Sequence, residues 1–435
     1  MSDSSTTSPA PSTASATPTR TRRVGLLTAP TSVAPPPPDP LGRVSRGPLV
    51  VAGLLAVALS WYVWSVHGAK FGALLVIGLF LGVALFHSRF GFTSAWRQLM
   101  AVGNGEGLRA HTLLLGTAST LIALVVATGA GLFGSTPAPA AGAIGLPLFV
   151  GAAVFAIGMQ LGGACASGTL FAVGSGQSTI VFTLGGFIAG SVFYTWAFPA
   201  FDGWPEVPGV LLSDHLGWFG SWAVTMLALA AVVVASRVVQ ARRNPPPQGT
   251  VPSARGVARV VRGSWPKWVG AVVLGVLAGA VMLVSGGIWG VTTAFALWGA
   301  KLLQMFGLHP ETWEFWQSDR YAELLANPVL TEKTSLTNIG IILGAAVAAA
   351  AAGAWKLHTS IPWRTAAAAV LGGALMGVGA RLAGGCNIGA YLGGISTGSL
   401  HGWLWAVFAL AGTWVGIKLR PVFGLGVPKP SDSVC

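Results

Sequence analysis

Apolar segments recur along this chain, and none of its 12 Asp and Glu residues falls inside one. A helix that crosses a bilayer needs about 20 mostly apolar residues, and lipid admits only helices and closed barrels as spanning structures. We therefore expect an all-α polytopic membrane protein with about 9–11 membrane segments. The apolar segments cover residues 48–66, 71–87, 110–133, 146–161, 178–198, 217–236, 268–285, 290–306, 337–355, 366–382 and 402–418.

Charged residues are too few to cover a water-facing surface. They make up 9% of the 435 residues, whereas a typical soluble domain has about 25%. The net charge of +13 does not predict nucleic-acid binding, because most of the basic residues lie in the N-terminal arm, one central loop and near the chain end. This distribution fits the excess of Lys and Arg that cytoplasmic loops of membrane proteins carry.

The chain divides at a basic segment without acids. We expect this segment, residues 237–266, to form a cytoplasmic loop, and the acidic segments 199–216 and 307–336 to face the other side. Ser, Thr, Pro and Ala dominate the first residues and predict a disordered arm. The expected parts are the arm 1–46, an extra membrane helix 47–67, a first repeat 68–236, the loop 237–266, a second repeat 267–420 and a tail 421–435.

Two short motifs each occur twice and interrupt the apolar segments with glycine and small polar residues. The first is FGFTSAW at 90–96 and WGVTTAF at 289–295; the second is GGACASG at 162–168 and AGGCNIG at 383–389. Their shared order predicts two homologous repeats, with broken or re-entrant helices around a central pathway. The alternative is that these glycines only pack helices, but packing motifs do not predict a matched Cys, Thr and aromatic register.

The two cysteines in these motifs suggest a binding site for a soft atom. A thiol is weakly polar and could contact a sulfur or selenium atom, while the helix N-termini after Cys165 and Cys386 would offer N–H groups to an anion. The candidate pathway residues are Cys165, Cys386, Arg381, Gly91, Gly163, Gly168, Gly290, Gly385, Asn387 and Gly389, with Arg89, Thr93, Thr292 and Gln160 in secondary roles.

Charge points to an anion as the ligand. The apolar segments lack the acids that cation and proton carriers keep within the membrane, whereas Arg381 lies about one and a half helical turns before Cys386. The alternative that Arg381 snorkels or binds helix C-terminal carbonyls stays open. Arg97 and Lys301 are interpreted as helix-end markers. No CxxC or Cys/His cluster has metal-ligand spacing, so we expect neither a metal site nor a cofactor.

The motifs resemble those of the YeeE/YedE family. Residues 377–390 (GVGARLAGGCNIGA) and 399–405 (SLHGWLW) are similar to its C-terminal signature, 88–97 to its first and 289–301 to its middle signature. The resemblance covers residues 68–425 and implies a multi-pass inner-membrane transporter for thiosulfate or another sulfur or selenium compound. It also implies passage of the ion between thiols, and a small cytosolic sulfur carrier of the TusA type as partner. Length and the middle signature place the chain nearer the YedE-like branch.

Gly91 departs from the family pattern, because the first signature usually carries a third cysteine there. The leading hypothesis is a transporter that imports a small sulfur-containing anion, with thiosulfate first among the candidates. The alternatives are a transporter or channel for a selenium or other sulfur species, and a membrane-embedded sulfurtransferase. An enzyme would need a base or metal to activate its thiol, and only His87 and His401 lie near the motifs, without an orienting carboxylate. We therefore expect no enzyme.

Overall fold

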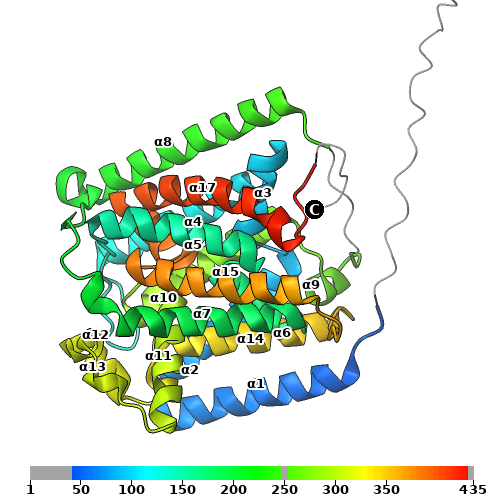
Figure 1. Cartoon of the computed structure of the whole chain (residues 1–435), viewed down its shortest axis with the longest axis horizontal. Helices are drawn as coiled ribbons and strands as arrows, with labels where there is room; N and C mark the ends of the chain where they lie inside the picture. The colour runs from blue at the N-terminus through cyan, green and yellow to red at the C-terminus, as the bar shows by residue number, and fades with distance from the viewer. Residues whose placement is uncertain (1–41, 247–252, 430–435) are drawn as a thin grey trace, which may run out of the picture. The chain divides into compact units, whose positions relative to one another are not determined.

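The computed structural model describes residues 42–246 and 253–429, which belong to one compact unit (Figure 1). These residues contain 10 candidate membrane spans, which confirms the predicted all-α polytopic membrane protein and its number of segments. The predicted N-terminal arm lies outside the described residues up to residue 41. The same holds for residues 247–252 of the basic segment and for 430–435 of the tail.

Helices make up almost all of the described regular structure. The exception is an antiparallel ladder of two strands, β1 (Ile144–Gly145) and β2 (Glu206–Val207). The α-helices are α1 Arg46–His67, α2 Ala69–Ser88, α3 Phe92–Val102, α4 Glu106–Thr128, α5 Leu146–Gly162, α6 Ala166–Gly174, α7 Ser178–Trp196, α8 Leu212–Arg243, α9 Ala258–Arg262, α10 Lys267–Ser285, α11 Thr292–Met305, α12 Glu314–Gln317, α13 Asp319–Ala326, α14 Lys333–Ala351, α15 Trp363–Leu382, α16 Gly393–Ser396 and α17 Leu400–Leu419. The shorter turns are η1 Phe198–Ala200, η2 Pro310–Thr312, η3 Val329–Thr331, the π-helix η4 Asn387–Leu392 and η5 Arg420–Phe423.

The glycine motifs break helices at four places. Two helices that start at a motif, α3 with 11 residues and α11 with 14, are too short to span a bilayer. The other two breaks divide a span, between α5 and α6 and between α15 and η4. Gly163, with φ of 83°, ends α5 in the left-handed conformation that glycine adopts without steric cost.

The basic segment is not entirely a loop. α8 continues to Arg243, inside the segment 237–266 that we expected to be a loop, and α9 forms a further short helix there. The sequence contains no helix breaker until Pro245, which explains why α8 extends beyond its apolar part.

The four pairs of neighbouring helices follow a two-fold pattern. α14 packs along α2 and α10 along α4, while α15 packs along α7 and α17 along α5. In each of these four pairs a helix of the first half therefore packs against a helix of the second. Small residues allow the close approach at the centre: a Cβ at Gly158 of α5 would lie 2.6 Å from the carbonyl oxygen of Gly372 in α15.

The two halves run in opposite directions. α4 and α10 start together, because Glu106 and Lys267 form an ion pair of 3.3 Å. α2 and α14 end at that same side, where the Trp265 amide donates to the His87 carbonyl, 2.8 Å away, and Arg262 donates to the Ala351 carbonyl. In sequence order α2 corresponds to α10, and α4 to α14, so corresponding helices are antiparallel. This is the arrangement of an inverted-topology repeat; the repeat boundaries at 68, 236, 267 and 420 stay a prediction.

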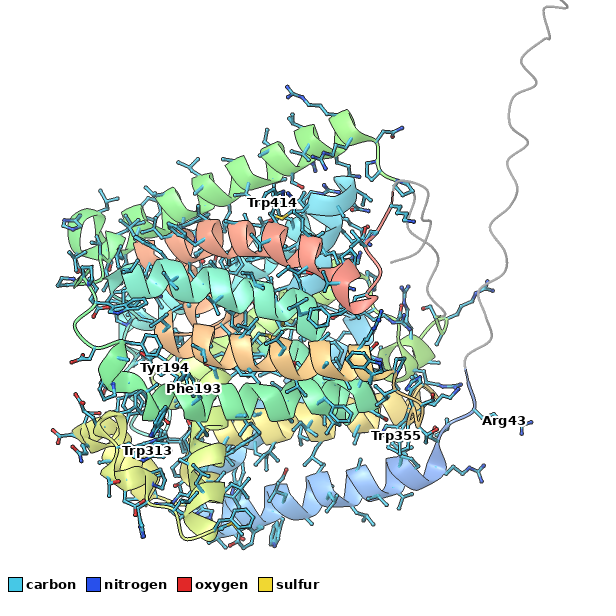
Figure 2. The ribbon with its side chains drawn as sticks, in the orientation of Figure 1. Arg43, Phe193, Tyr194, Trp313, Trp355 and Trp414 are labelled. Atoms are coloured by element: carbon cyan, nitrogen blue, oxygen red, sulfur yellow. The ribbon has the colours of Figure 1, made fainter. Side chains whose placement is uncertain are left out.

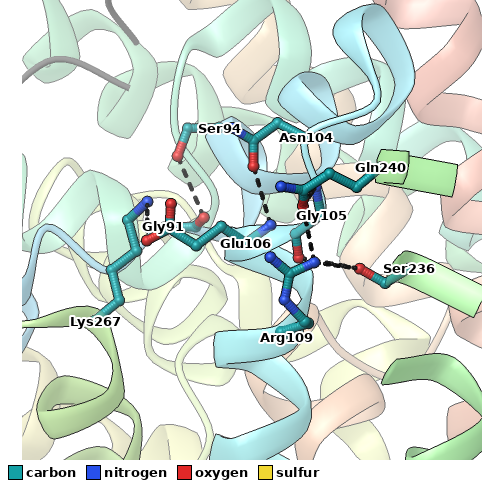
Figure 3. Close-up of polar contacts among 9 residues, drawn as sticks. All are labelled: Gly91, Ser94, Asn104, Gly105, Glu106, Arg109, Ser236, Gln240 and Lys267. Atoms are coloured by element: carbon teal, nitrogen blue, oxygen red, sulfur yellow. Dashed lines mark hydrogen bonds and ion pairs between the residues drawn. The ribbon is translucent and has the colours of Figure 1, made fainter. Parts of the chain in front are cut away.

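Opposite charges mark the two sides. We call the side with the start of α1, the end of α8 and α9 the basic side, after Arg43, Arg243 and Arg262; the opposite side, with β2, α12 and α13, is the acidic side (Figures 1 and 2). On the basic side, Arg109 of α4 donates to Ser236 Oγ and Gln240 Oε1 of α8, at 3.2 and 2.9 Å (Figure 3). These bonds fix α8 beside the connection from α3 to α4.

One connection is much longer than the corresponding connection in the other half. Residues 103–105 join α3 to α4 on the basic side, whereas residues 306–332 join α11 to α14 on the acidic side. We call residues 306–332 the acidic-side cap. Its Phe315 packs against Tyr194 and Phe198, with ring centroids 6.2 and 5.6 Å apart. The cap therefore covers the acidic-side end of α7.

Candidate functional site

Cys165 lies at the break between α5 and α6. It is the N-cap residue of α6 and is only 2% exposed. Its Sγ lies 3.7 Å from Ser167 Oγ, and the backbone amides of Phe92 and Gly168 hydrogen-bond to the thiol. A Cβ at Gly168 would approach this sulfur to 3.3 Å. Amides at the starts of α3 and α6 thus meet at one sulfur atom.

Cys386 holds the corresponding position in the second half. It is the N-cap residue of the π-helix η4, is 2% exposed, and accepts from the Ile388 amide at 3.4 Å. The Gly389 amide also bonds to the thiol. Before it, Gly385 has φ of 158°, and a Cβ there would lie 2.7 Å from the Ala390 nitrogen. Only glycine fits this tight turn without displacing backbone.

The two thiols share one region of the protein. The Cys386 thiol lies within electrostatic reach of both Cys165 and Arg381, and both cysteines belong to the same buried cluster. The ring of Phe92, whose amide bonds to Cys165, packs 6.0 Å from that of Tyr391 in η4. The structure therefore brings Cys165, Cys386 and Arg381 together at the centre, with helix N-termini from both halves.

Equivalent side chains brace the two breaks. Arg381 Nη2 donates to Thr292 Oγ1 at 2.8 Å, and Gln160 Nε2 donates to the Thr93 carbonyl at 3.3 Å. Each bond joins the last turn of a broken helix to the first turn of a half-length helix. The two sites differ in charge, because only the Cys386 side carries a guanidinium at this position.

Two further arginines approach Gln160 on the basic side. Arg97 Nη1 lies 3.5 Å from Gln160 Oε1, and Arg420 Nη1 donates to the Gln160 carbonyl. Arg97 lies within α3 and Lys301 within α11, so interpreting them as helix-end markers was wrong. Sequence reasoning also missed Arg420, since its position next to Lys418, at the end of the last apolar segment, indicated only a helix end.

Buried polar atoms without a hydrogen-bond partner gather at the motifs. Among the described residues they include Thr93 Oγ1, Arg381 Nε, Trp289 Nε1 and both side-chain polar atoms of Asn387. Buried polar groups in folded proteins are normally hydrogen-bonded, and each exception requires an explanation. A ligand or water in the central region would supply the missing partners.

A cavity of 310 Å³ lies on the acidic side, and we call it the vestibule. Arg381, Gly384, Asp202 and Glu206 line it, and Gly384 lies two residues before Cys386. Tyr194, at the acidic-side end of α7, forms part of its wall (Figure 2). Neither cysteine lines the cavity. No sequence pattern indicated the vestibule, because its lining comes from α7, β2, the cap and α15.

The other predicted residues occupy different surroundings. Gly91 caps α3 in an extended conformation (φ of −148°), and its carbonyl accepts from Ser94 Oγ at 3.3 Å (Figure 3). A Cβ at Gly290 would meet only Thr334, at 3.7 Å, and a Cβ at Gly389 would meet nothing within 4 Å. Arg89 is not brought to the thiols; it lines a separate cavity of 150 Å³ on the basic side.

The partners of both thiols are suited to binding an anion. In the part of the chain that the structure describes, both thiols bond to backbone amides and Cys165 also to a hydroxyl, and no imidazole or carboxylate bonds to either. Soft sulfur atoms surrounded by amide N–H groups match a ligand with a soft atom and negatively charged oxygens.

Comparisons with known proteins agree with this arrangement. The sequence model of a family described as sulphur transport matches residues 87–415. The chain is 34% identical over 165 residues to a probable transporter, YedE, from Escherichia coli strain K12, a match that covers 38% of this chain and 40% of that protein. The thiosulfate transporter TsuA is similar over more of its length: the Spirochaeta thermophila protein is 28% identical over 361 residues, covering 78% of this chain and 96% of that protein. The Escherichia coli TsuA is 25% identical over 367 residues, covering 80% and 94%. The match over residues 87–415 shows that the chain belongs to the sulphur transport family, YeeE/YedE.

Proposed function

We propose that this protein is a multi-pass inner-membrane transporter that imports a small sulfur-containing anion, with thiosulfate as the leading candidate. The observation that carries the proposal is the placement of Cys165 and Cys386, each at the start of a helix and within reach of backbone amides. Family membership and the relatives named as thiosulfate transporters support it. The excess of Arg on the basic side supports a cytoplasmic location for that side.

The proposed route runs from the acidic to the basic side. The anion enters the vestibule and meets Arg381, passes the thiols of Cys386 and then Cys165, and leaves past Gln160. This order is supported by the position of Arg381 in the wall of the vestibule and by the contacts of Gln160 with Arg97 and Arg420 at the other end. A guanidinium near each end favours an anion over a cation.

Thiols suit a site that must bind the anion and then release it. The soft terminal sulfur of thiosulfate would contact Cys386 and then Cys165, while its oxygens accept from the amides of Ile388 and Gly168. An S–H group is a weak donor and a weak acceptor, so neither thiol holds the ion tightly. Conduction requires sites that attract the ion but also let it leave.

Two finer points belong to the same proposal. A small cytosolic sulfur carrier of the TusA type is the proposed partner at the basic side, as the family resemblance implies. The alternative substrates are a selenium species or another sulfur species, since a thiol contacts either soft atom. A membrane-embedded sulfurtransferase is less favoured, because the thiols have no base among their described partners.

Uptake by purified protein in liposomes tests the proposal. Wild-type protein should accumulate ³⁵S-thiosulfate unchanged, and Cys165→Ala and Cys386→Ala should each abolish uptake while the protein stays folded. Cys435→Ala is the matched control, because it removes the third cysteine of the chain, which lies outside both motifs. Full uptake by both motif variants would refute the thiol role, and release of sulfite would favour the enzyme.

A further inference from the structure

The vestibule holds charges of both signs that do not pair with each other. Arg381, Asp202 and Glu206 all line it, and the Tyr194 side chain lies within electrostatic reach of all three. The ion pairs found within residues 42–246 and 253–429 do not join Arg381 to either acid. Arg381 instead donates to the neutral Thr292 hydroxyl, and its Nε has no partner. Charges removed from water are costly unless a partner compensates them.

Acids at this position are unexpected for a protein that takes up only bare dianions. Like charges raise the energy of an anion that passes them, and interfaces use such repulsion to select against the wrong partner. Both acids are exposed, whereas Arg381 is partly buried beside Gly384. The vestibule therefore has a negative rim and a positive inner end, which is the arrangement that a ligand with a cation at one end and an anion at the other would complement.

Aromatic side chains form the wall between the two charged ends. Tyr194 and Phe201 stack with centroids 5.3 Å apart, and Phe315 and Tyr321 of the cap stack at 4.4 Å. All four line the cavity. Such a wall packs against an apolar linker and attracts an ammonium group through its π faces. Arg320 already stacks on the Tyr321 ring, at 5.9 Å, but does not line the cavity.

The cap makes the vestibule specific to one end of the pathway. Residues 306–332 supply Phe315 and Tyr321, whereas the corresponding connection in the other half has only residues 103–105. The cavity of 310 Å³ is also far larger than the roughly 10–15 Å³ that one ordered water needs. The space, the walls and the charges thus suit a compound larger than an inorganic oxyanion.

We propose that the vestibule binds zwitterionic organic thiosulfates, in which a short apolar linker joins an ammonium group to an S-sulfonate. The S-sulfonate lies on Arg381, the linker on the aromatic wall, and the ammonium between Asp202 and Glu206. This inference rests on the proposed function, since it assigns a substrate class to the outer end of the same pathway. It concerns recognition at the vestibule and involves no covalent step.

Binding to the full-length protein in lipid nanodiscs, measured by calorimetry, tests the inference. The probes are 2-aminoethyl thiosulfate, ethyl thiosulfate, which lacks the ammonium, and inorganic thiosulfate. Wild-type protein should bind the aminoethyl compound about fivefold more tightly than the ethyl compound, the upper range for exposed ion pairs. Equal affinities would overturn the inference without any variant being needed.

Charge removal at the rim gives the sharper result. Asp202→Asn combined with Glu206→Gln should weaken the binding of 2-aminoethyl thiosulfate about fivefold and strengthen the binding of inorganic thiosulfate. The reason is that the rim then neither attracts the ammonium nor repels the dianion. Glu323→Gln is the control, since this exposed acid of the cap does not line the cavity. A change of the two affinities in the same direction would overturn the inference. Absence of thiosulfate uptake by liposomes that contain the wild-type protein would instead overturn the proposed function.

Discussion

Replacing Arg381 by Gln changes the charge of the pathway with little change of shape. Gln is the residue that the other half carries at this position, as Gln160, where it bridges to Thr93. The introduced glutamine could keep a hydrogen bond to Thr292, which now accepts from Arg381 at 2.8 Å. The variant therefore isolates the guanidinium charge, which faces the vestibule and lies within electrostatic reach of Cys386.

The expected loss follows from the energy of one charged hydrogen bond. Such a bond contributes about 1.5–3 kcal/mol, and 1.4 kcal/mol corresponds to a tenfold change in affinity, so thiosulfate should bind about 10- to 140-fold more weakly. Calorimetric titration of thiosulfate measures the change directly. Thr292→Val is the matched control, because it removes the neutral partner and keeps the charge. It should weaken thiosulfate binding less than Arg381→Gln does.

The reasoning fails if Arg381→Gln binds thiosulfate with unchanged affinity while the protein stays folded. Arg381 would then only brace α15 against α11. In that case the melting temperature should fall without any change in binding.

Three further variants test packing and the site. Gly158→Ala should lower stability by about 1–3 kcal/mol, because its Cβ would lie 2.6 Å from the backbone of α15. Gly53→Ala is the control and should be neutral or stabilising, because its Cβ would meet nothing within 4 Å. Thermal melts distinguish the two variants, and equal melting temperatures would contradict the close packing of α5 on α15. Gly91→Cys should fold normally and lower the KM for thiosulfate uptake, because the backbone there is extended and a new thiol would stand at the start of α3; an unchanged KM would separate Gly91 from the pathway. Breaking the half-exposed pair of Glu106 and Lys267 with Glu106→Gln should cost under about 1 kcal/mol, and a large drop in the melting temperature would show that the pair does more than join α4 to α10.

The sequence was most informative where composition and position carry the signal. The lengths of the apolar segments predicted the number of spans. A Cys after glycines predicted the breaks after α5 and α15, because Gly163 and Gly385 occupy backbone conformations that other residues rarely adopt. Cys165 and Cys386 then follow as N-cap residues, since each is the first residue after a break.

The direction of each half was not predicted. An apolar helix reads the same in either direction, so α2 and α10 look alike in sequence although they run oppositely. Only contacts between distant segments, such as Glu106 with Lys267, reveal the inversion. The vestibule was missed for the same reason, since its charges come from two distant segments, one with Asp202 and Glu206 and the other with Arg381.

The position of the soft atom of a bound substrate tests the central claim most directly. Selenosulfate carries selenium in place of the terminal sulfur of thiosulfate, and its anomalous scattering would locate that atom in crystals of the full-length protein. The account predicts selenium in van der Waals contact with the Sγ of Cys386 or Cys165, with the oxygens on the amides of Ile388 or Gly168. Selenium bound away from both cysteines would contradict it.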